Sequence, residues 1–349
     1  MKKILVFKLG AIGDVLMTTP FLRELKLKEP ASCVDYLVGN WSSAVLKNNP
    51  NINKLIEVED SIFYKKQISK LLKLYSQLNS EQYDEIYLLH RNLFYYYYFY
   101  SLFPKKLHGF RTIQSCFLKE EFDESQHHLY NYSRLVKKDT KSTQMDFYLP
   151  KDHQLNPNIL QKNNLQLDQS IIAINPGGGA NPGETVTVRQ WPQSSYVQFI
   201  KKINKSHPKI QLVLTGGPTD QDLCNEIMQE VQETNTINLT SKFGLMDFRK
   251  ILDSIDVFIT GDTGGMHMAA AANCKVLSLF GPTNPHEKAP IGSNNAWIWP
   301  KIECSPCYTG KFKGCQNPVC MDAISIDMVY DNCLNLLSLP KSMIESNDL

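Results

Sequence analysis

Residues 257–282 read VFITGDTGGMHMAAAANCKVLSLFGP, and this stretch is the strongest indication of the fold class. Its two apolar runs, residues 257–260 and 276–280, are typical of strands buried on both faces of a parallel sheet. Between them lie a glycine-rich turn and a run of Met and Ala that predicts a helix starting near Gly264. The unpaired N–H groups and the positive dipole end of such a helix attract an anion. The stretch therefore predicts either a phosphate-binding βαβ unit or an ordinary tight turn of the same build.

The same alternation of strand-like and helix-like segments occupies most of the chain. It predicts strands at residues 3–7, 34–38, 54–58, 85–89, 107–110, 171–175, 210–215 and 237–239, and helices at 13–27, 62–77, 93–103, 220–234 and 246–252. Residues 151–170, which are rich in Asn, Gln, Asp and Lys, interrupt the pattern. We therefore expect an α/β protein with two Rossmann-like domains, residues 1–165 and 166–349.

Composition excludes several classes of protein. The 349 residues contain 37 basic and 35 acidic side chains, which gives a net charge of +2. Because positive charge is not in clear excess, the composition does not favour nucleic acid as a partner. No window approaches the roughly 18 uninterrupted apolar residues of a membrane-spanning helix. Residues 1–10 fit a first strand better than a signal peptide, because Lys8 interrupts a short apolar run. We expect a soluble, cytoplasmic protein.

In open α/β sheets ligands bind beyond the carboxyl ends of the strands, so the turns after the strands are the candidate site. Asp14 follows the first strand and starts a helix. It is either a general base or a first-turn carboxylate that complements the helix dipole. Arg189 lies just before a Trp-Pro pair that begins another helix. Its guanidinium either binds a leaving diphosphate or is an ordinary surface group.

The other turns add donor-binding candidates. Gly178 and Gly179 belong to a run of three glycines whose amides can approach a ligand. Asp220 and Asp222 lie near a helix start, where they either hold ribose hydroxyls or cap the helix. His267 lies one turn into the helix of the opening stretch, either as a ligand contact or as a core side chain.

Four cysteines gather within residues 304–320, namely Cys304, Cys307, Cys315 and Cys320. Their first spacing, Cys-x2-Cys, is typical of a metal knuckle, and four thiolates suit a structural Zn or Fe. There are two alternatives: the segment is a loop of free thiols, or the cysteines form disulfides outside a reducing compartment. The five scattered cysteines are expected to be buried thiols: Cys33, Cys116, Cys224, Cys274 and Cys333.

Taken together, the turns resemble a known family. The motifs are KLGAIGD (8–14), NPGGG with RQWP (175–179 and 189–192), LTGGPTD (214–220), and GDTGGMHMAAA followed by LFGPTNP (261–271 and 279–285). In this order they resemble the heptosyltransferases of glycosyltransferase family nine over nearly the whole chain. The resemblance implies the GT-B fold, in which two Rossmann-like domains face each other across a cleft. It also implies inverting transfer of a heptose from ADP-heptose to the inner core of lipopolysaccharide.

The resemblance assigns residues to roles. Asp14 matches the base that deprotonates the acceptor, and Arg189 stands where the family usually has a lysine. The donor-binding residues that it implies are Gly13, Asp262, Thr263, Gly264, Gly265 and His267. The chemistry then requires no metal cofactor, while a cysteine-rich segment near this place in some relatives favours a structural metal.

Two alternatives stay open at this point. One is a related transferase with another nucleotide sugar or a protein acceptor, and the other is a nucleotide-sugar-binding protein without activity. A dehydrogenase is disfavoured because the turns lack G-x-G-x-x-G. A lipid-linked acceptor implies peripheral contact with the inner face of the inner membrane. Candidates for contact with the acceptor, or else for solvated surface and packing, are Arg91, Lys105, Lys106, His108, Arg111 and the tyrosines at 95–98.

Overall fold

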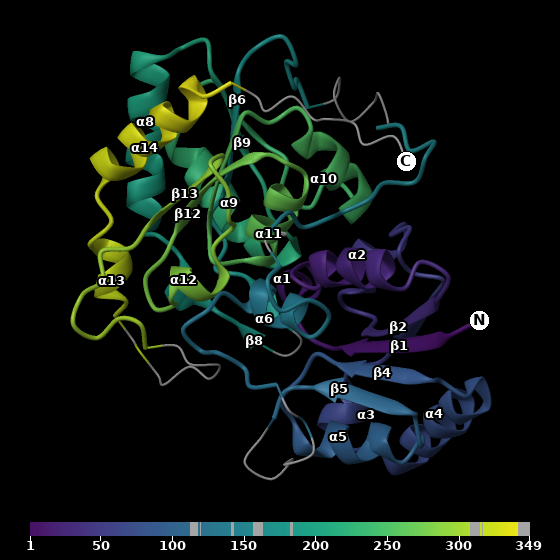
Figure 1. The fold of residues 1–349 in the computed structure, drawn as a ribbon. Coiled ribbons are helices and arrows are strands. Elements are labelled where there is room, and N and C mark those ends of the chain that lie inside the picture. The colour runs from purple at the N-terminus through teal and green to yellow at the C-terminus, as the bar shows by residue number, and fades with distance from the viewer. Residues whose placement is uncertain are drawn as a thin grey trace. The chain divides into compact units, whose positions relative to one another are not determined.

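The computed structural model describes residues 1–111, 118, 120–140, 143–155, 163–181, 184–307, 315 and 317–340, so Cys116 lies outside the described residues. The chain forms two compact units, Met1–Tyr148 (unit 1) and Leu149–Leu349 (unit 2) (Figure 1). The boundary predicted after residue 165 falls between this division and the first strand of unit 2.

Unit 1 contains a five-stranded parallel sheet in the order β3-β2-β1-β4-β5. Its strands are β1 (Lys3–Lys8), β2 (Cys33–Gly39), β3 (Lys54–Val58), β4 (Glu85–Leu88) and β5 (Lys106–Gly109). Its helices are α1 (Ile12–Leu16), α2 (Thr19–Lys28), η1 (Ser43–Leu46), α3 (Ser61–Tyr64), α4 (Ile68–Glu81), α5 (Leu93–Tyr100) and α6 (His128–Arg134).

Side chains alternate between the two faces of this sheet, and each face is covered by helices (Figure 1). Phe7 of β1 packs on Phe63 of α3 and on Phe99 of α5, with ring centroids 5.1 and 4.5 Å apart. On the opposite face Tyr87 of β4 meets Phe21 of α2, with centroids 5.3 Å apart. The strands are therefore buried on both sides, as their apolar runs predict.

Unit 2 repeats this architecture with six parallel strands in the order β10-β9-β6-β11-β12-β13. They are β6 (Ile171–Asn175), β9 (Gln211–Leu214), β10 (Thr236–Asn238), β11 (Val257–Gly261), β12 (Lys275–Leu279) and β13 (Asn295–Ile298), and a small antiparallel pair is formed by β7 (Ala180–Asn181) and β8 (Glu184–Thr185). The helices are η2 (Thr187–Arg189), α8 (Gln193–Ser206), η3 (Pro218–Asp220), α9 (Gln221–Glu230), α10 (Leu245–Leu252), α11 (Gly264–Ala271), α12 (Pro285–Lys288), α13 (Val319–Asp322) and α14 (Ile326–Ser338).

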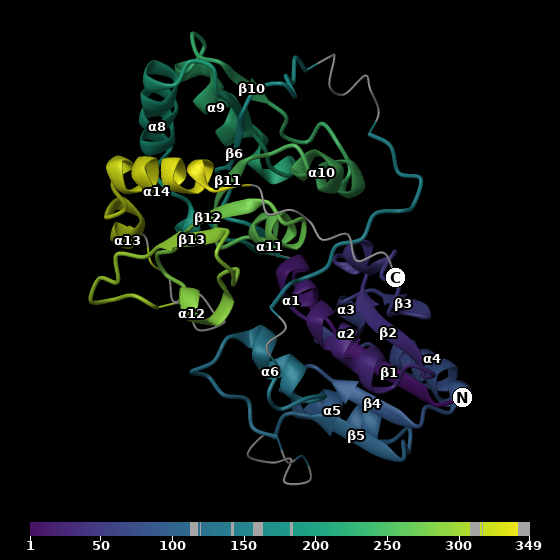
Figure 2. The ribbon, with the colours of Figure 1, turned by 45° about the horizontal axis from the view of Figure 1, so that its top comes forward.

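The core of unit 2 also has two halves. Helices α8 and α14 lie on one face of the sheet, and α10 and α11 lie on the other (Figure 2). Trp191 is buried in the first half, where its indole N–H donates to the Ile324 carbonyl at 2.9 Å. In the second half Phe248 of α10 contacts Phe258 of β11, with ring centroids 6.1 Å apart. None of the helices in the described part of the chain is both long and apolar enough to cross a membrane.

The structure corrects the predicted elements in a few places. The helix predicted at residues 13–27 is interrupted between α1 and α2, where the hydroxyls of Thr18 and Thr19 donate to carbonyls three residues earlier and Pro20 follows. The helix predicted at 62–77 is also two helices, because Lys66 has a φ of 47°. The sequence pattern missed eight elements of the described residues, namely α6, β7, β8, η2, α12, β13, α13 and α14.

Candidate active site

The turn between β11 and α11 is the centre of the candidate site in unit 2. Thr263 has extended backbone and immediately precedes Gly264, the first residue of α11. Asp262, Thr263 and His267 are all buried there, with exposures of 4%, 7% and 3%. Gly265 has no room for a side chain, since a Cβ would lie 2.9 Å from Nδ2 of Asn175 at the end of β6. The predicted helix start is confirmed, and its buried polar side chains lie at the carboxyl edge of the sheet.

Arg189 and Asp262 form a buried pair beside this turn. The Arg189 guanidinium donates to the Asp262 backbone carbonyl at 2.9 Å and lies 3.5 Å from carboxylate atom Oδ2. Burial by itself would raise the pKa of Asp262, but the charge of Arg189, followed by that of Lys288, outweighs it and lowers that pKa. The carboxylate is therefore ionised and lies among positive groups. The sequence pattern predicted both Arg189 and Asp262 as site residues but did not predict that they form an ion pair.

The glycine loop after β6 packs against the same turn. Gly179 has a φ of +87°, which favours glycine, and its Cβ position lies 3.5 Å from Cγ2 of Thr263. Gly178 is covered by its own loop, because a Cβ there would lie 1.9 Å from the Val186 carbonyl oxygen. The structure thus brings the loop, Thr263 and the Arg189–Asp262 pair together.

The two acids after β9 differ in their surroundings. Asp220 accepts a hydrogen bond from the Gly217 amide at 2.9 Å, and burial raises the pKa of its carboxyl. A Cβ on Gly177 would lie 2.1 Å from its Oδ1. Asp222 is exposed in the first turn of α9. Asp220 therefore caps the short helix η3, and among the described residues its side chain makes no cap hydrogen bond to α9. Contact of Asp220 or Asp222 with ribose stays a prediction.

Asp14 belongs to unit 1, where it lies in the first turn of α1 beyond the carboxyl end of β1. The turn needs glycine at position 10, whose φ is +130° and whose Cβ position lies 3.2 Å from Oδ2 of Asp14. Gly13 is buried within α1. The structure therefore places Asp14 at the carboxyl edge of its sheet, as the motif predicts.

Lys8 is a functional candidate that the sequence analysis missed. It is 7% exposed, and its Nζ donates to the Tyr132 hydroxyl at 2.8 Å and to the Leu89 carbonyl at 3.3 Å. Burial by itself would lower the pKa of Lys8, but Tyr132 and then Asp14 outweigh it and raise that pKa. Asp14 thus has a buried cation nearby. A lysine inside a buried strand is the only signal in the sequence that points to it.

Most of the residues expected to contact the acceptor form ion pairs or packing contacts within unit 1. Lys105 pairs with Asp84 at 2.7 Å, and Lys106 and His108 approach Glu85 at 3.5 and 3.2 Å. Since Glu85 and Lys106 begin β4 and β5, these pairs lie towards the amino ends of the strands, whereas Asp14 lies at the carboxyl ends.

The remaining expected contacts are divided between ion pairs and packing. Arg91 and Arg111 pair with Glu124 and Glu121. Tyr95 and Tyr96 are buried, and the Tyr98 hydroxyl donates to the Leu71 carbonyl, which leaves Tyr97 exposed. Packing and surface pairing therefore account for most of this set.

The four clustered cysteines are free thiols in the structure. Cys304 and Cys315 are exposed, while Cys320 is buried, and burial, with smaller effects of Cys307 and Cys304, raises the pKa of Cys320 to about 11. Within the described ranges no group of three or more His, Cys, Asp or Glu side chains is placed to hold a metal ion. A structural Zn or Fe at these cysteines therefore stays a prediction.

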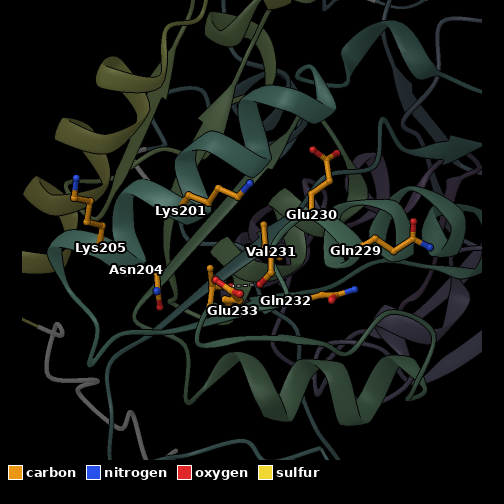
Figure 3. A pocket seen from close by; sticks show the side chains of 9 residues that line it. Lys201, Asn204, Lys205, Gln229, Glu230, Val231, Gln232 and Glu233 are labelled. Carbon is orange, nitrogen blue, oxygen red and sulfur yellow. Dashed lines mark hydrogen bonds between the residues drawn. The ribbon is translucent and has the colours of Figure 1, made fainter.

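A surface pocket in unit 2 lies away from all of these residues. It has a volume of about 430 Å³ and lies between the ends of α8 and α9. Its lining residues are Lys201, Asn204, Lys205, Gln229, Glu230, Val231, Gln232, Glu233 and Thr234 (Figure 3). Both helices end just before the next strand begins, so the pocket lies at the amino edge of the sheet and is not the candidate site.

Comparison with known proteins identifies the family. Residues 71–314 match the model of glycosyltransferase family 9 (heptosyltransferase). Lipooligosaccharide heptosyltransferase 2 of Campylobacter jejuni is 27% identical over 345 residues, which cover 93% of this chain and 95% of that protein. A family 9 glycosyltransferase of Veillonella parvula has a TM-score of 0.78 at 21% identity, covering 96% of this chain and 97% of that one.

The fold of a second solved structure agrees. ADP-heptose LPS heptosyltransferase II of Escherichia coli has a TM-score of 0.75 at 19% identity, covering 97% of this chain and 98% of that one. The two parallel-sheet units are those of the GT-B fold. The chain therefore belongs to glycosyltransferase family 9 and is a glycosyltransferase.

Proposed function

We propose that this enzyme transfers a heptose from ADP-heptose to the inner core of lipopolysaccharide or lipooligosaccharide, with inversion at the anomeric carbon. The observation that carries the proposal is the buried Arg189–Asp262 pair at the start of α11, in a chain of the heptosyltransferase family. The names of the C. jejuni and E. coli relatives support this choice of donor and acceptor.

Unit 2 supplies the groups that we assign to the leaving ADP. The guanidinium of Arg189 uses one nitrogen on Asp262. A guanidinium carries five N–H donors, so others can serve phosphate oxygens. The amides of residues 263–265 start α11, where the helix dipole favours an anion. Both groups stabilise the charge that develops on the diphosphate as its bond to the sugar breaks.

Asp14 of unit 1 is the proposed general base. In the reaction a hydroxyl oxygen of the acceptor forms a bond to the anomeric carbon, and the bond from that carbon to the diphosphate oxygen breaks. The hydroxyl proton moves to Asp14, and ADP leaves with the electron pair. The nearby charge of Lys8 favours the ionised carboxylate that accepts this proton.

We propose that the chemistry needs no metal ion, because Arg189 and the start of α11 already supply positive charge to the diphosphate. Transfer that persists in EDTA supports this view, and transfer that stops and returns with Mg²⁺ contradicts it. Elemental analysis of the purified protein for Zn and Fe addresses the cysteine cluster separately.

We also propose that the enzyme acts in the cytoplasm at the inner face of the inner membrane. A lipid-linked acceptor is anchored in a bilayer, so its transferase must reach the bilayer surface. Large apolar side chains are exposed on or just after two helices of unit 1, namely Ile68, Leu72, Tyr97, Tyr100 and Phe103. Aromatic side chains suit the interfacial zone of a bilayer, and co-sedimentation with anionic vesicles tests the contact.

The central experiment is a transfer assay by mass spectrometry, with ADP-heptose and truncated core acceptors. Asp14→Asn should abolish transfer, because the amide cannot take the proton, and should leave donor binding by calorimetry unchanged. The control is Asp139→Asn, an exposed aspartate of unit 1. Normal turnover by Asp14→Asn would overturn the assignment. A panel of other nucleotide sugars as donors separates heptose transfer from transfer of another sugar.

A further inference from the structure

A second carboxylate of unit 1, Asp60, lies beside the same glycine as Asp14. Asp60 precedes α3, and its charge is stabilised by its own backbone N–H group and by those of Trp41 and Gly10. A Cβ on Gly39, the last residue of β2, would lie 2.2 Å from its Oδ1. We call residues 10, 39–42, 60 and 64 the Asp60 corner. Since the Cβ position of Gly10 is 3.2 Å from Asp14, the corner adjoins the proposed base.

The Asp60 corner contains buried polar atoms without partners. Asp60 is 8% exposed, and its Oδ1 has no hydrogen-bond partner in the described structure. Ser42 of the same corner is fully buried, and its hydroxyl also has no hydrogen-bond partner among the described residues. A buried carboxylate oxygen without a donor costs free energy unless a ligand or water donates to it. Oδ1 of Asp60 can therefore accept a hydrogen bond in addition to those that the backbone N–H groups donate to the carboxyl.

The charge of the Asp60 corner indicates which kind of ligand group can donate a hydrogen bond to Asp60. Burial outweighs the N–H groups and raises the pKa of Asp60 above its usual value, so the corner tolerates negative charge poorly. A phosphate or a carboxylate would add a third acidic group beside Asp60 and Asp14. A neutral hydroxyl donates a hydrogen bond and adds no charge.

The Asp60 corner contains two exposed aromatic residues, Trp41, whose backbone N–H faces the carboxyl of Asp60, and Tyr64. Trp41 follows Gly39 by two residues and is 49% exposed. Tyr64 lies one turn after Asp60 on α3 and is 57% exposed, and the negative charges of both Asp60 and Asp14 act on its hydroxyl. Exposed aromatic faces next to a hydrogen-bonding acid suit the C–H face and the hydroxyl edge of a sugar ring.

We propose that the Asp60 corner binds the acceptor sugar next to the reacting hydroxyl, and that this ring is neutral: one of its hydroxyls donates to Oδ1 of Asp60, and Trp41 and Tyr64 contact its face. The inference rests on the proposed function, because it takes the acceptor to be an oligosaccharide. It makes Asp60 a determinant of acceptor specificity, separate from the donor groups of unit 2.

The kinetic test uses the full chain, ADP-heptose and two matched core oligosaccharides, one ending in a neutral heptose and the other carrying a phosphate on that ring. The wild-type enzyme should prefer the neutral acceptor at least tenfold in kcat/KM. Asp60→Asn should raise the acceptor KM at least tenfold and leave the donor KM within twofold. Trp41→Ala should raise the acceptor KM about fivefold or more, and Trp297→Ala, an exposed tryptophan of unit 2, should not.

A stability measurement separates binding from scaffolding. Because the pKa of Asp60 is raised, its charge disfavours folding at neutral pH, so Asp60→Asn should melt at a temperature no lower than the wild type. A purely structural aspartate would instead lower the melting temperature. An unchanged acceptor KM in Asp60→Asn, or equal use of the phosphorylated acceptor, overturns the inference.

A binding measurement keeps the inference apart from the proposed function. Calorimetry of the neutral oligosaccharide with Asp14→Asn, and with Asp14→Asn combined with Asp60→Asn, needs no turnover. Suppose that the wild type transfers no heptose but that the double variant binds the oligosaccharide at least tenfold more weakly than Asp14→Asn does. The proposed function is then wrong, while the assignment of the Asp60 corner as a sugar-binding site is supported. If the two variants bind equally, or neither binds, the corner is not an acceptor site.

Discussion

Arg189 and Asp262 are 73 residues apart in the chain, yet each limits what the other can do. Their side chains are 11% and 6% exposed, so neither charge is hydrated enough to stand alone. Asp262 orients the guanidinium of Arg189, and the charge of Arg189 keeps Asp262 ionised. We regard this pair as the residue-level basis of donor binding.

Arg189→Ala should destabilise the protein by roughly 3 kcal/mol, because it leaves a buried carboxylate without its main counter-charge. It should also abolish detectable transfer. Arg189→Lys keeps the charge and should retain transfer within about tenfold of the wild type, with about 1–2 kcal/mol of lost stability from the missing planar fork. Urea unfolding and the transfer assay measure both effects. If the alanine variant is as stable as the wild type, the pair does not carry the energy that we assign to it.

His90 gives unit 1 a pH dependence that can be measured. Its Nε2 accepts a hydrogen bond from the Leu9 amide at 2.7 Å, and burial, followed by the charge of Lys8, holds its pKa well below the usual value. The folded protein thus keeps His90 neutral while the unfolded chain takes up a proton. Below about pH 6.5 this difference should remove up to about 1.4 kcal/mol of stability per pH unit.

His90→Asn should therefore be less stable than the wild type at pH 7.5, since it loses ring contacts to Phe7 and Tyr95, but should lose less stability on acidification to pH 5. Free energies of unfolding at the two pH values decide the matter. His286→Asn, at an exposed position, is the control. An equal loss on acidification in the His90 variant and the wild type argues against this origin of acid sensitivity.

At the scale of elements, the turn from β1 to α1 is the most constrained connection in unit 1. Gly10 has backbone angles that L side chains rarely adopt, and it lies between two carboxylates. The helix after it is short, because Thr18, Thr19 and Pro20 interrupt the run that the sequence pattern predicts as continuous. The position of Asp14 therefore depends on the turn more than on helix length.

Gly10→Ala should cost about 1–3 kcal/mol through backbone strain and should lower kcat at least tenfold, because the new Cβ displaces Asp14. Gly244→Ala is a control without backbone strain: no atom lies within 4 Å of its Cβ position and its φ is −74°, so we expect no change in kcat and a loss of about 1 kcal/mol or less, from alanine at the N-cap of α10. Thermal unfolding and initial rates give both quantities. Equal behaviour of the two variants would show that the turn is not strained as we describe.

At the scale of the whole molecule, the proposed roles are divided between the two units. The donor groups Arg189, Asp262 and Thr263 belong to unit 2, whereas Asp14 and Asp60 belong to unit 1. Donor binding and acceptor chemistry should therefore respond to different variants.

ADP at a hundred times its Kd should add about 2.7 kcal/mol to the stability of the unit that binds it. The shift should persist in Asp14→Asn and vanish in Arg189→Ala, because the diphosphate contacts are assigned to unit 2. Thermal melts over a titration of ADP measure it. Loss of the shift in Asp14→Asn would mean that nucleotide binding also needs unit 1, contrary to this division.

The two parallel sheets could be predicted from the sequence, because apolar runs alternate with amphipathic segments in both halves of the chain. Hydrophobic period and turn chemistry are local properties that a sequence shows directly. The sequence also placed Asp14, Thr263 and Gly264 after strand ends, which the structure confirms. Reading single turns in isolation could not predict which of them meet.

The contacts between turns that follow different strands of one sheet could be seen only in the folded chain. It pairs Arg189 with Asp262, and it places Asp220, which follows β9, against Gly177, which follows the neighbouring strand β6. It also brings Asp60 beside Gly10, because β3 and β1 lie on either side of β2. The physical reason is that strand order, and not distance along the chain, sets which carboxyl ends adjoin. A charged side chain at a strand end gains its function only when that order supplies its partner.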